Sequence, residues 1–232
     1  LMLNASYAYV VRTTSLNADP ANRRVRDAQF GTDRGDIMVG NTPIVTSNPV
    51  QDRFAFQRVY NPGGLYSHVT GYYSFLYGGS GLERYYSPQL AGTSDAQFLQ
   101  NLVNAATGKK PQGATLETTL DARAQAAAAK GLGDRPGGVV AIDYTTGAVK
   151  ALVSSPTYDP NALSSHDLNA TTDAWKALND DPANPLNDRA AREIYPPGST
   201  FKLVVSAAAL EAGYTPETHV DAPDGLRLPG ST

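Results

Sequence analysis

The 232-residue sequence contains no cysteine and only three histidines. The lack of thiols excludes disulfides, cysteine nucleophiles and thiolate zinc sites, and it is weakly typical of exported proteins. His68, His166 and His219 are isolated and lack the spacing of metal ligands, so we expect no metal site. The sequence also lacks a glycine-rich phosphate loop and a dinucleotide motif, which predicts that no nucleotide cofactor is bound.

Long apolar runs and an excess of positive charge are missing as well. No segment approaches the 18 consecutive apolar residues that would predict a membrane-spanning helix. Lysine and arginine number 19 against 22 aspartates and glutamates, which gives a formal net charge of −3. Proteins that bind nucleic acid normally carry a basic surface, so we expect no nucleic acid partner. Hydrophobic residues make up 41% of the chain, enough to form a buried core.

The composition changes along the chain. Residues 1–110 carry a net charge of +3 and nine of the 13 tyrosines, whereas residues 111–232 carry −6 and are richer in alanine. A Gly/Pro/Lys-rich stretch over residues 107–113 is typical of a linker. We therefore predict two domains, residues 1–112 and residues 113–232.

Turn residues and short β-prone segments predict an irregular, mostly β structure for the first domain. In the second domain, Asp121 precedes an alanine-rich segment that predicts a helix capped by Asp121 and ended by Gly131 and Gly133. Two apolar runs follow, at residues 138–142 and 148–153, joined by a turn. They predict a hairpin of central strands in a covered sheet.

A polar segment rich in proline, asparagine and aspartate then runs from residue 157 to residue 192. We expect this segment to shape a surface or a cleft, because long irregular segments within a domain are usually functional.

Ser199 and Lys202 are the candidate catalytic residues. They follow two prolines and begin an apolar segment that runs without a breaker to Gly213, which predicts a buried helix with Ser199 in its first turn. Their three-residue spacing places both side chains on one face. A serine hydroxyl needs a neighbouring base, and a lysine can act as that base when it is neutral, a form that desolvation and the helix N-terminus favour. This pattern indicates acyl transfer through an acyl-serine, with backbone N–H groups stabilising the oxyanion.

The S-x-x-K pattern alone is weak evidence, because about one match is expected by chance in a chain of this length. The competing interpretation makes Ser199 an N-terminal capping hydroxyl and Lys202 a solvated lysine of the first turn. A wider set of motifs supports the catalytic interpretation. They are Arg34–Ile37, Tyr66–Tyr72, Gly81–Tyr85, Thr119–Asp121 with Gln125, Gly137–Asp143, Ala151–Asn161, Asn187–Ala190 and Tyr195–Lys202.

These motifs resemble the class B penicillin-binding proteins, most closely the actinobacterial PbpA type of cell division. The resemblance implies an α+β fold. An elongated, mostly β N-terminal pedestal (residues 1–112) would precede the first part of a penicillin-binding serine transpeptidase domain, a sheet with a buried helix that starts at the nucleophile. It also implies a peptidoglycan D,D-transpeptidase that crosslinks D-Ala-D-Ala stem peptides, is acylated by β-lactams at Ser199, and uses Lys202 as the base.

The sequence departs from the family in two places. Met38–Asn41 stand where the family usually has an Asp-Arg-x-Gly run, which affects only the detail of the pedestal. The S-x-N and K-T-G motifs that complete the family's catalytic cleft do not follow Lys202. Ser15–Asn17 and Thr145–Gly147 are read as coincidental matches. We therefore expect this chain to be the N-terminal part of a longer protein and to be inactive alone.

The resemblance also implies a location and partners. We expect a membrane anchor upstream of Leu1, removed from this chain, that holds this part on the extracytoplasmic side. Expected partners are stem peptides, β-lactams, the C-terminal remainder of the protein, and a cell-wall glycosyltransferase or division proteins. One alternative is a non-catalytic docking fragment of a cell-wall or division complex. A more remote one is a class D-like β-lactamase or β-lactam sensor, because Ser199–Lys202 also resembles those enzymes.

Overall fold

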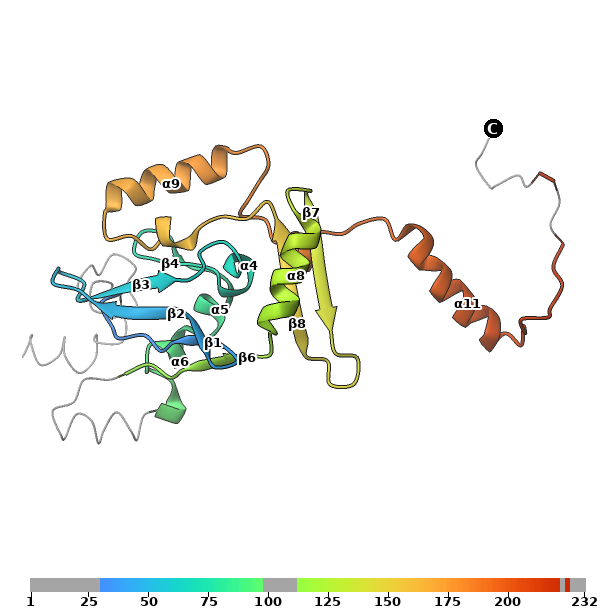
Figure 1. Cartoon of the computed structure of the whole chain (residues 1–232), viewed down its shortest axis with the longest axis horizontal. Coiled ribbons are helices and arrows are strands. Elements are labelled where there is room, and N and C mark those ends of the chain that lie inside the picture. Colours follow the sequence, from blue (N-terminus) through green and yellow to red (C-terminus); the bar gives the residue numbers. More distant parts are fainter. Residues whose placement is uncertain (1–29, 98–111, 222–223, 226–232) are drawn as a thin grey trace, which may run out of the picture. The chain divides into compact units, whose positions relative to one another are not determined.

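A computed structural model of the chain describes residues 30–97, 112–221 and 224–225 (Figure 1). The Ser15–Asn17 match and most of the predicted linker over residues 107–113 lie outside these residues. The chain divides into two compact units between Glu193 and Ile194. Among the described residues, no helix is both long enough and apolar enough to cross a membrane.

The first unit is built on a four-stranded sheet in the order β3-β2-β1-β6. Strands β1, β2 and β3 pair antiparallel, and β6 joins β1 in parallel. Their bounds are Ile37–Val39 for β1, Thr42–Pro49 for β2, Phe56–Tyr60 for β3 and Leu116–Thr118 for β6. The predicted mostly β first domain is thus confirmed in its main sheet. Because β6 lies beyond residue 112, the pairing of β1 crosses the expected domain boundary, and that boundary stays a prediction.

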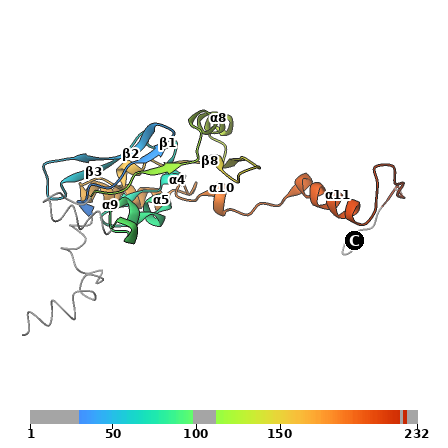
Figure 2. The same cartoon turned by 90° about the horizontal axis from the view of Figure 1, so that it is seen from below.

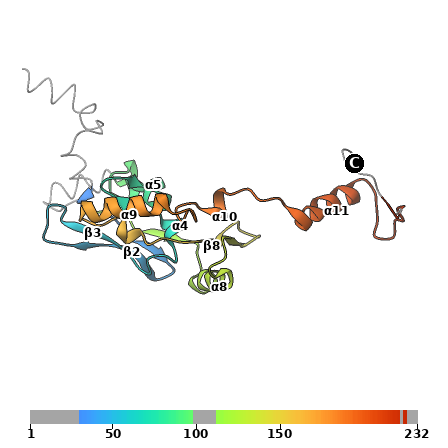
Figure 3. The same ribbon diagram turned by 90° about the horizontal axis from the view of Figure 1, so that it is seen from above.

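Short helices cover one face of this sheet, as the opposite views from below and from above show for α5 (Figures 2 and 3). Ile37, Val45 and Leu90 are fully buried between the sheet and these helices, and Leu82 packs against them. A two-stranded ribbon of β4 and β5 lies nearby in the chain. The bounds of these elements are Ser67–Thr70 for α4, Tyr73–Ser74 for β4, Gly78–Gly79 for β5, Gly81–Tyr85 for α5, Ser87–Leu90 for α6 and Asp95–Gln97 for a 3-10 turn.

Helix α8, Ala122–Leu132, confirms the predicted capped helix. The Asp121 carboxylate accepts hydrogen bonds of 2.9 Å from the N–H groups of Arg123 and Ala124, which satisfies two donors that the helix leaves free. Gly133 follows the helix with φ +59°, a conformation that favours glycine. The buried Gln125 amide donates to the carbonyl of Leu152 at 2.8 Å and accepts from its N–H at 2.9 Å, which fixes α8 to β8.

Strands β7 (Gly137–Ile142) and β8 (Val149–Ser155) form the predicted hairpin. The Asp143 carboxylate accepts a hydrogen bond of 2.9 Å from the Thr145 N–H in the connecting turn. The expectation of covered central strands is wrong within the described residues, because β7 and β8 form a two-stranded sheet of their own. Along β7 half-buried and exposed residues alternate, since α8 covers only one face of the hairpin.

The polar segment from residue 157 to residue 192 is more ordered than its composition predicts. It contains a 3-10 turn (Pro160–Ala162), helix α9 (Leu168–Asp180) and helix α10 (Arg189–Arg192). Asp167 caps α9 by accepting from two backbone N–H groups.

The start of that segment also packs on the first domain. The Asn161 side chain accepts from the Tyr60 N–H and donates to the Tyr60 carbonyl, each at 2.9 Å. The Gln57 amide donates to the Ser164 carbonyl at 2.7 Å. Residues 157–164 therefore complete the packing at the β3 edge of the sheet.

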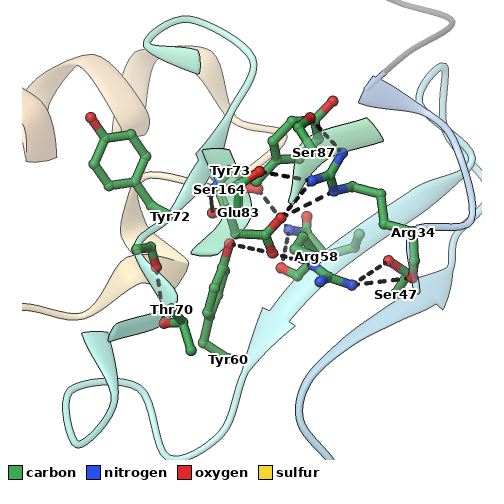
Figure 4. Close-up of polar contacts among 12 residues, drawn as sticks. Arg34, Ser47, Arg58, Tyr60, Thr70, Tyr72, Tyr73, Glu83, Ser87 and Ser164 are labelled. Carbon is green, nitrogen blue, oxygen red and sulfur yellow. Dashed lines mark hydrogen bonds and ion pairs between the residues drawn. The ribbon is translucent and has the colours of Figure 1, made fainter. Parts of the chain in front are cut away.

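A buried ion cluster joins three elements of the first unit (Figure 4). The Glu83 carboxylate, fully buried, pairs with Arg34 at 2.7 Å and with Arg58 at 2.6 Å, and both arginines are at most 3% exposed. Tyr60 donates to Glu83 at 3.3 Å, and the Arg34 guanidinium lies 3.9 Å from the centre of the Tyr73 ring. Burial raises the pKa of Glu83, but the two guanidinium groups outweigh burial and hold that pKa below its usual value.

Candidate active site

The segment with Ser199 forms a tight turn that leads into a helix. Pro197 adopts a helical conformation and precedes a 3-10 turn, Gly198–Thr200, in which the Thr200 N–H donates to the Pro197 carbonyl at 3.1 Å. Helix α11 follows at Phe201–Glu211, and Gly213 lies just beyond it with φ +88°. The predicted helix is confirmed, with Ser199 in the 3-10 turn that precedes it.

Ser199 lies in the 3-10 turn, and Lys202 lies three residues on, in the first turn of α11. Residues three apart are neighbours on one side of a helix. Both residues are exposed. Across the described residues, neither the Ser199 hydroxyl nor the Lys202 ammonium has a hydrogen bond or an ion pair. The geometry thus places hydroxyl and amine on one side of the chain without joining them.

The predicted burial of this helix is wrong within its own unit. No residue of α11 is buried, and the exposed fractions of Leu203, Val204 and Leu210 are 77%, 58% and 61%. A helix that is apolar nearly all round needs neighbours on every side to be covered. Local propensity forms α11, and the described residues of its own unit do not cover its apolar faces.

The turn before α11 leaves one backbone donor beside the nucleophile. The Thr200 N–H donates to the Pro197 carbonyl and the Phe201 N–H to the Gly198 carbonyl, so both are used within the turn. Across the described residues the Ser199 N–H has no backbone partner, and the helix dipole adds partial positive charge at this end. Negative charge that develops on a carbonyl oxygen beside Ser199 would be stabilised by this N–H group.

The Asn187–Ala190 motif has a structural role that sequence analysis did not foresee. The Asp188 carboxylate accepts from the Ser154 hydroxyl at 2.8 Å and caps α10 by accepting from the Ala191 N–H at 3.2 Å. The Ser154 hydroxyl also accepts from the Ala190 N–H at 3.0 Å. These bonds fix α10 to strand β8. The aspartate directly before a short helix was the available signal, because aspartate is a preferred N-cap residue.

The described ranges hold no cluster of three or more histidine, aspartate or glutamate side chains suited to a metal ion.

Family models match two parts of the chain. Residues 34–116 match the penicillin binding protein A dimerisation domain, and residues 137–232 match the penicillin binding protein transpeptidase domain. The second match contains Ser199 and Lys202.

The alignments with curated relatives cover nearly the whole chain. The chain is 42% identical over 237 residues to the peptidoglycan D,D-transpeptidase PbpA of Mycobacterium tuberculosis, and this alignment covers all of the chain and 48% of the relative. It is 32% identical to the peptidoglycan D,D-transpeptidase MrdA of Acinetobacter baumannii, covering 96% of this chain and 38% of that protein. The chain thus spans about half the length of the first relative and less than half the length of the second.

Solved structures agree with these relatives. The fold matches penicillin-binding protein A from M. tuberculosis in its ceftriaxone acyl-enzyme complex with a TM-score of 0.85 and 40% identity, over 89% of this chain and 47% of that one. It also matches Pseudomonas aeruginosa PBP2 in complex with WCK 5153, with a TM-score of 0.67 and 31% identity, over 86% of this chain and 45% of that one.

Proposed function

The chain belongs to the class B penicillin-binding proteins of the PbpA type, and from this membership we propose that the whole protein is a peptidoglycan D,D-transpeptidase. Ser199 is the nucleophile and Lys202 the base in this proposal. The observation that carries it is the Ser199-x-x-Lys202 turn at the start of an apolar helix, within the residues that match the transpeptidase domain.

The proposed reaction proceeds in two steps. The Ser199 Oγ attacks the carbonyl carbon of the penultimate D-Ala while the Lys202 Nζ accepts the hydroxyl proton. The peptide C–N bond then breaks, and the terminal D-Ala leaves as an amine that takes up the proton. An amine from a neighbouring stem peptide next attacks the Ser199 ester, forms the crosslink and returns the proton to Ser199.

The rest of the proposed site lies outside this chain. The family resemblance assigns the facing wall of the cleft and the second oxyanion donor to the S-x-N and K-T-G motifs. We expect these motifs in the portion of the relatives' length that the chain does not span. In the same proposal an N-terminal helix anchors the protein in the membrane, with this part on the extracytoplasmic side. The pedestal would contact a cell-wall glycosyltransferase or division proteins.

The proposed function is tested by the intact mass of the full-length protein before and after incubation with benzylpenicillin. The mass is expected to increase by one benzylpenicillin molecule, and peptide mapping is expected to place the adduct on Ser199. A β-lactam resembles the D-Ala-D-Ala end of the substrate, and a relative has been solved as a penicillin G acyl-enzyme complex. An adduct on another residue would contradict the assignment of Ser199. Rapid loss of the adduct with turnover of the antibiotic would favour a β-lactamase.

Lys202→Ala is expected to slow acylation of the full-length protein by benzylpenicillin by about 10²- to 10⁴-fold, the usual contribution of a general base. The measurement is the acylation rate of the variant beside that of the unmodified protein, followed by intact mass over time. An unchanged acylation rate in Lys202→Ala would assign the base to another residue.

A further inference from the structure

A cleft of ≈ 880 Å³ lies within the first unit and is not used by the proposed reaction. Its walls come from α4, α5, β8, α9 and α10, so pedestal residues face residues that follow the β7–β8 hairpin. The volume is in the range of ligand-binding clefts in proteins. None of its lining residues belongs to the segment that carries Ser199 and Lys202.

Aromatic side chains form much of the wall. Tyr85 lines the cleft with 75% of its surface exposed. Trp175 is held in place by Tyr77, which stacks on it at 4.2 Å between ring centres, and by the edge of Tyr72 at 5.9 Å. Rigid, partly open aromatic rings offer apolar contact area together with a polar group at one end.

Polar groups with unused hydrogen-bonding capacity lie among these rings. Across the described residues, the Tyr72 hydroxyl, the Trp175 indole N–H and the Arg192 guanidinium have no side-chain hydrogen bond or ion pair. Tyr72 points away from the buried Glu83 cluster (Figure 4). Burial raises its pKa, which the nearby positive charge of Arg84 only partly offsets, so its hydroxyl stays protonated and can donate. One carboxylate oxygen of Asp188 accepts the bonds described above, which leaves the second as an acceptor.

The combination of aromatic rings with unpaired donors and acceptors identifies the class of ligand. An apolar helix in this cleft would leave the donors and acceptors unpaired, at a cost in free energy for each group. A phosphate-rich polymer would meet the negative charge of Asp188. A sugar ring has an apolar face for the aromatic rings and hydroxyls at its edge for the donors and the acceptor. An N-acetyl group adds an amide that pairs with a carboxylate and a guanidinium.

We propose that this cleft binds the N-acetylated glycan strand of peptidoglycan through Tyr72, Tyr85, Trp175, Asp188 and Arg192. The inference deepens the proposed function, since it names a second contact with the polymer whose stem peptides Ser199 would attack. The cleft holds the sugar backbone, while the transpeptidase site takes the peptide. Holding the backbone raises the effective concentration of the stem peptides for the same enzyme molecule.

The experiment is calorimetric titration of the full-length protein with soluble peptidoglycan glycan strands from which the stem peptides have been removed. Such strands lack the D-Ala-D-Ala group and are not substrates of the proposed reaction. The unmodified protein is expected to bind them, and Tyr85→Ala is expected to weaken binding about tenfold, as truncation of an interface aromatic often does. Tyr144→Ala is the matched control, because Tyr144 is 94% exposed in the β7–β8 turn and does not line the cleft.

Benzylpenicillin acylation of the same variants is measured in parallel. Tyr85→Ala should form the adduct at the unmodified rate, which shows that the protein is folded. If the adduct forms but the bare strands do not bind, or if Tyr85→Ala and Tyr144→Ala bind them equally well, the inference is wrong and the proposed function stands. If no variant forms the adduct, the proposed function fails. Binding of the strands that depends on Tyr85 would then still support the proposed glycan site in the cleft.

Discussion

Ser199→Ala in the full-length protein is expected to lower the rate of covalent attachment of benzylpenicillin by about 10⁴-fold or more, to the point where no adduct is seen. Alanine removes the only oxygen that this side chain could offer as a nucleophile. The backbone is expected to remain as it is, because the turn is made by Pro197, Gly198 and the Thr200 N–H, and the Ser199 side chain makes no hydrogen bond to another described residue. The measurement is the intact mass over time.

Ser206→Ala is the matched control, since Ser206 lies in the same helix and is also exposed. It should be acylated at the unmodified rate. If Ser199→Ala still forms an adduct while keeping its fold, the nucleophile is elsewhere and Ser199 has no catalytic role. If both variants lose the adduct, the helix itself has been disturbed, and the loss in Ser199→Ala does not identify the nucleophile.

Glu83→Ala is expected to have the largest effect on stability. It leaves the guanidinium groups of Arg34 and Arg58 buried without a counter-charge, and breaking a buried ion pair in this way costs about 3–5 kcal/mol. In the full-length protein, amides of β1, β2, β3 and α5 should exchange hydrogen about two to four orders of magnitude faster. Hydrogen exchange read by mass spectrometry measures this region separately from the rest of the protein.

The exposed Glu117 of β6 supplies the control, and Glu117→Ala should leave these exchange rates nearly unchanged. The pKa of Glu83 is lowered in the folded state, so its contribution to stability is complete above the pKa of an unfolded glutamate and is lost as the pH falls through the folded value. Protection of the sheet should therefore fall in acid, and Glu83→Gln should abolish that part of the pH dependence. Equal protection in Glu83→Ala and Glu117→Ala would show that the cluster adds little stability.

Features that depend on neighbouring residues could be predicted from the sequence. Asp121 and the alanines behind it specify helix α8 within a few residues, and the β7–β8 hairpin follows from two apolar runs around a turn. The Ser199–Lys202 spacing is likewise local, which is why the turn and helix appear where they were expected. Their catalytic roles were inferred from the S-x-x-K pattern and the family resemblance, and they remain a proposal.

Features that depend on distant partners could not be predicted. Strands β6 and β1 pair in parallel, but neither short strand has a sequence pattern that would predict this partner. Asp167 caps helix α9, but the polar composition of this helix does not predict a helix from the sequence. The burial of its apolar face depends on distant residues, because Trp175 packs against Tyr72 and Tyr158. The exposure of β7 and α11 was missed for the same reason, since their composition indicates burial without saying which segment covers them.

The bonds that join β3 to residues 157–164 have a consequence for how the chain folds. They span about a hundred positions, so the pedestal has a high contact order although it occupies the front of the sequence. During synthesis the β3 edge can find its partners only after Ser164 has emerged, and until then the nascent sheet exposes an unpaired edge that can misassemble. We expect residues 34–116 to be poorly folded when expressed alone, because the folding unit is longer than the matched domain.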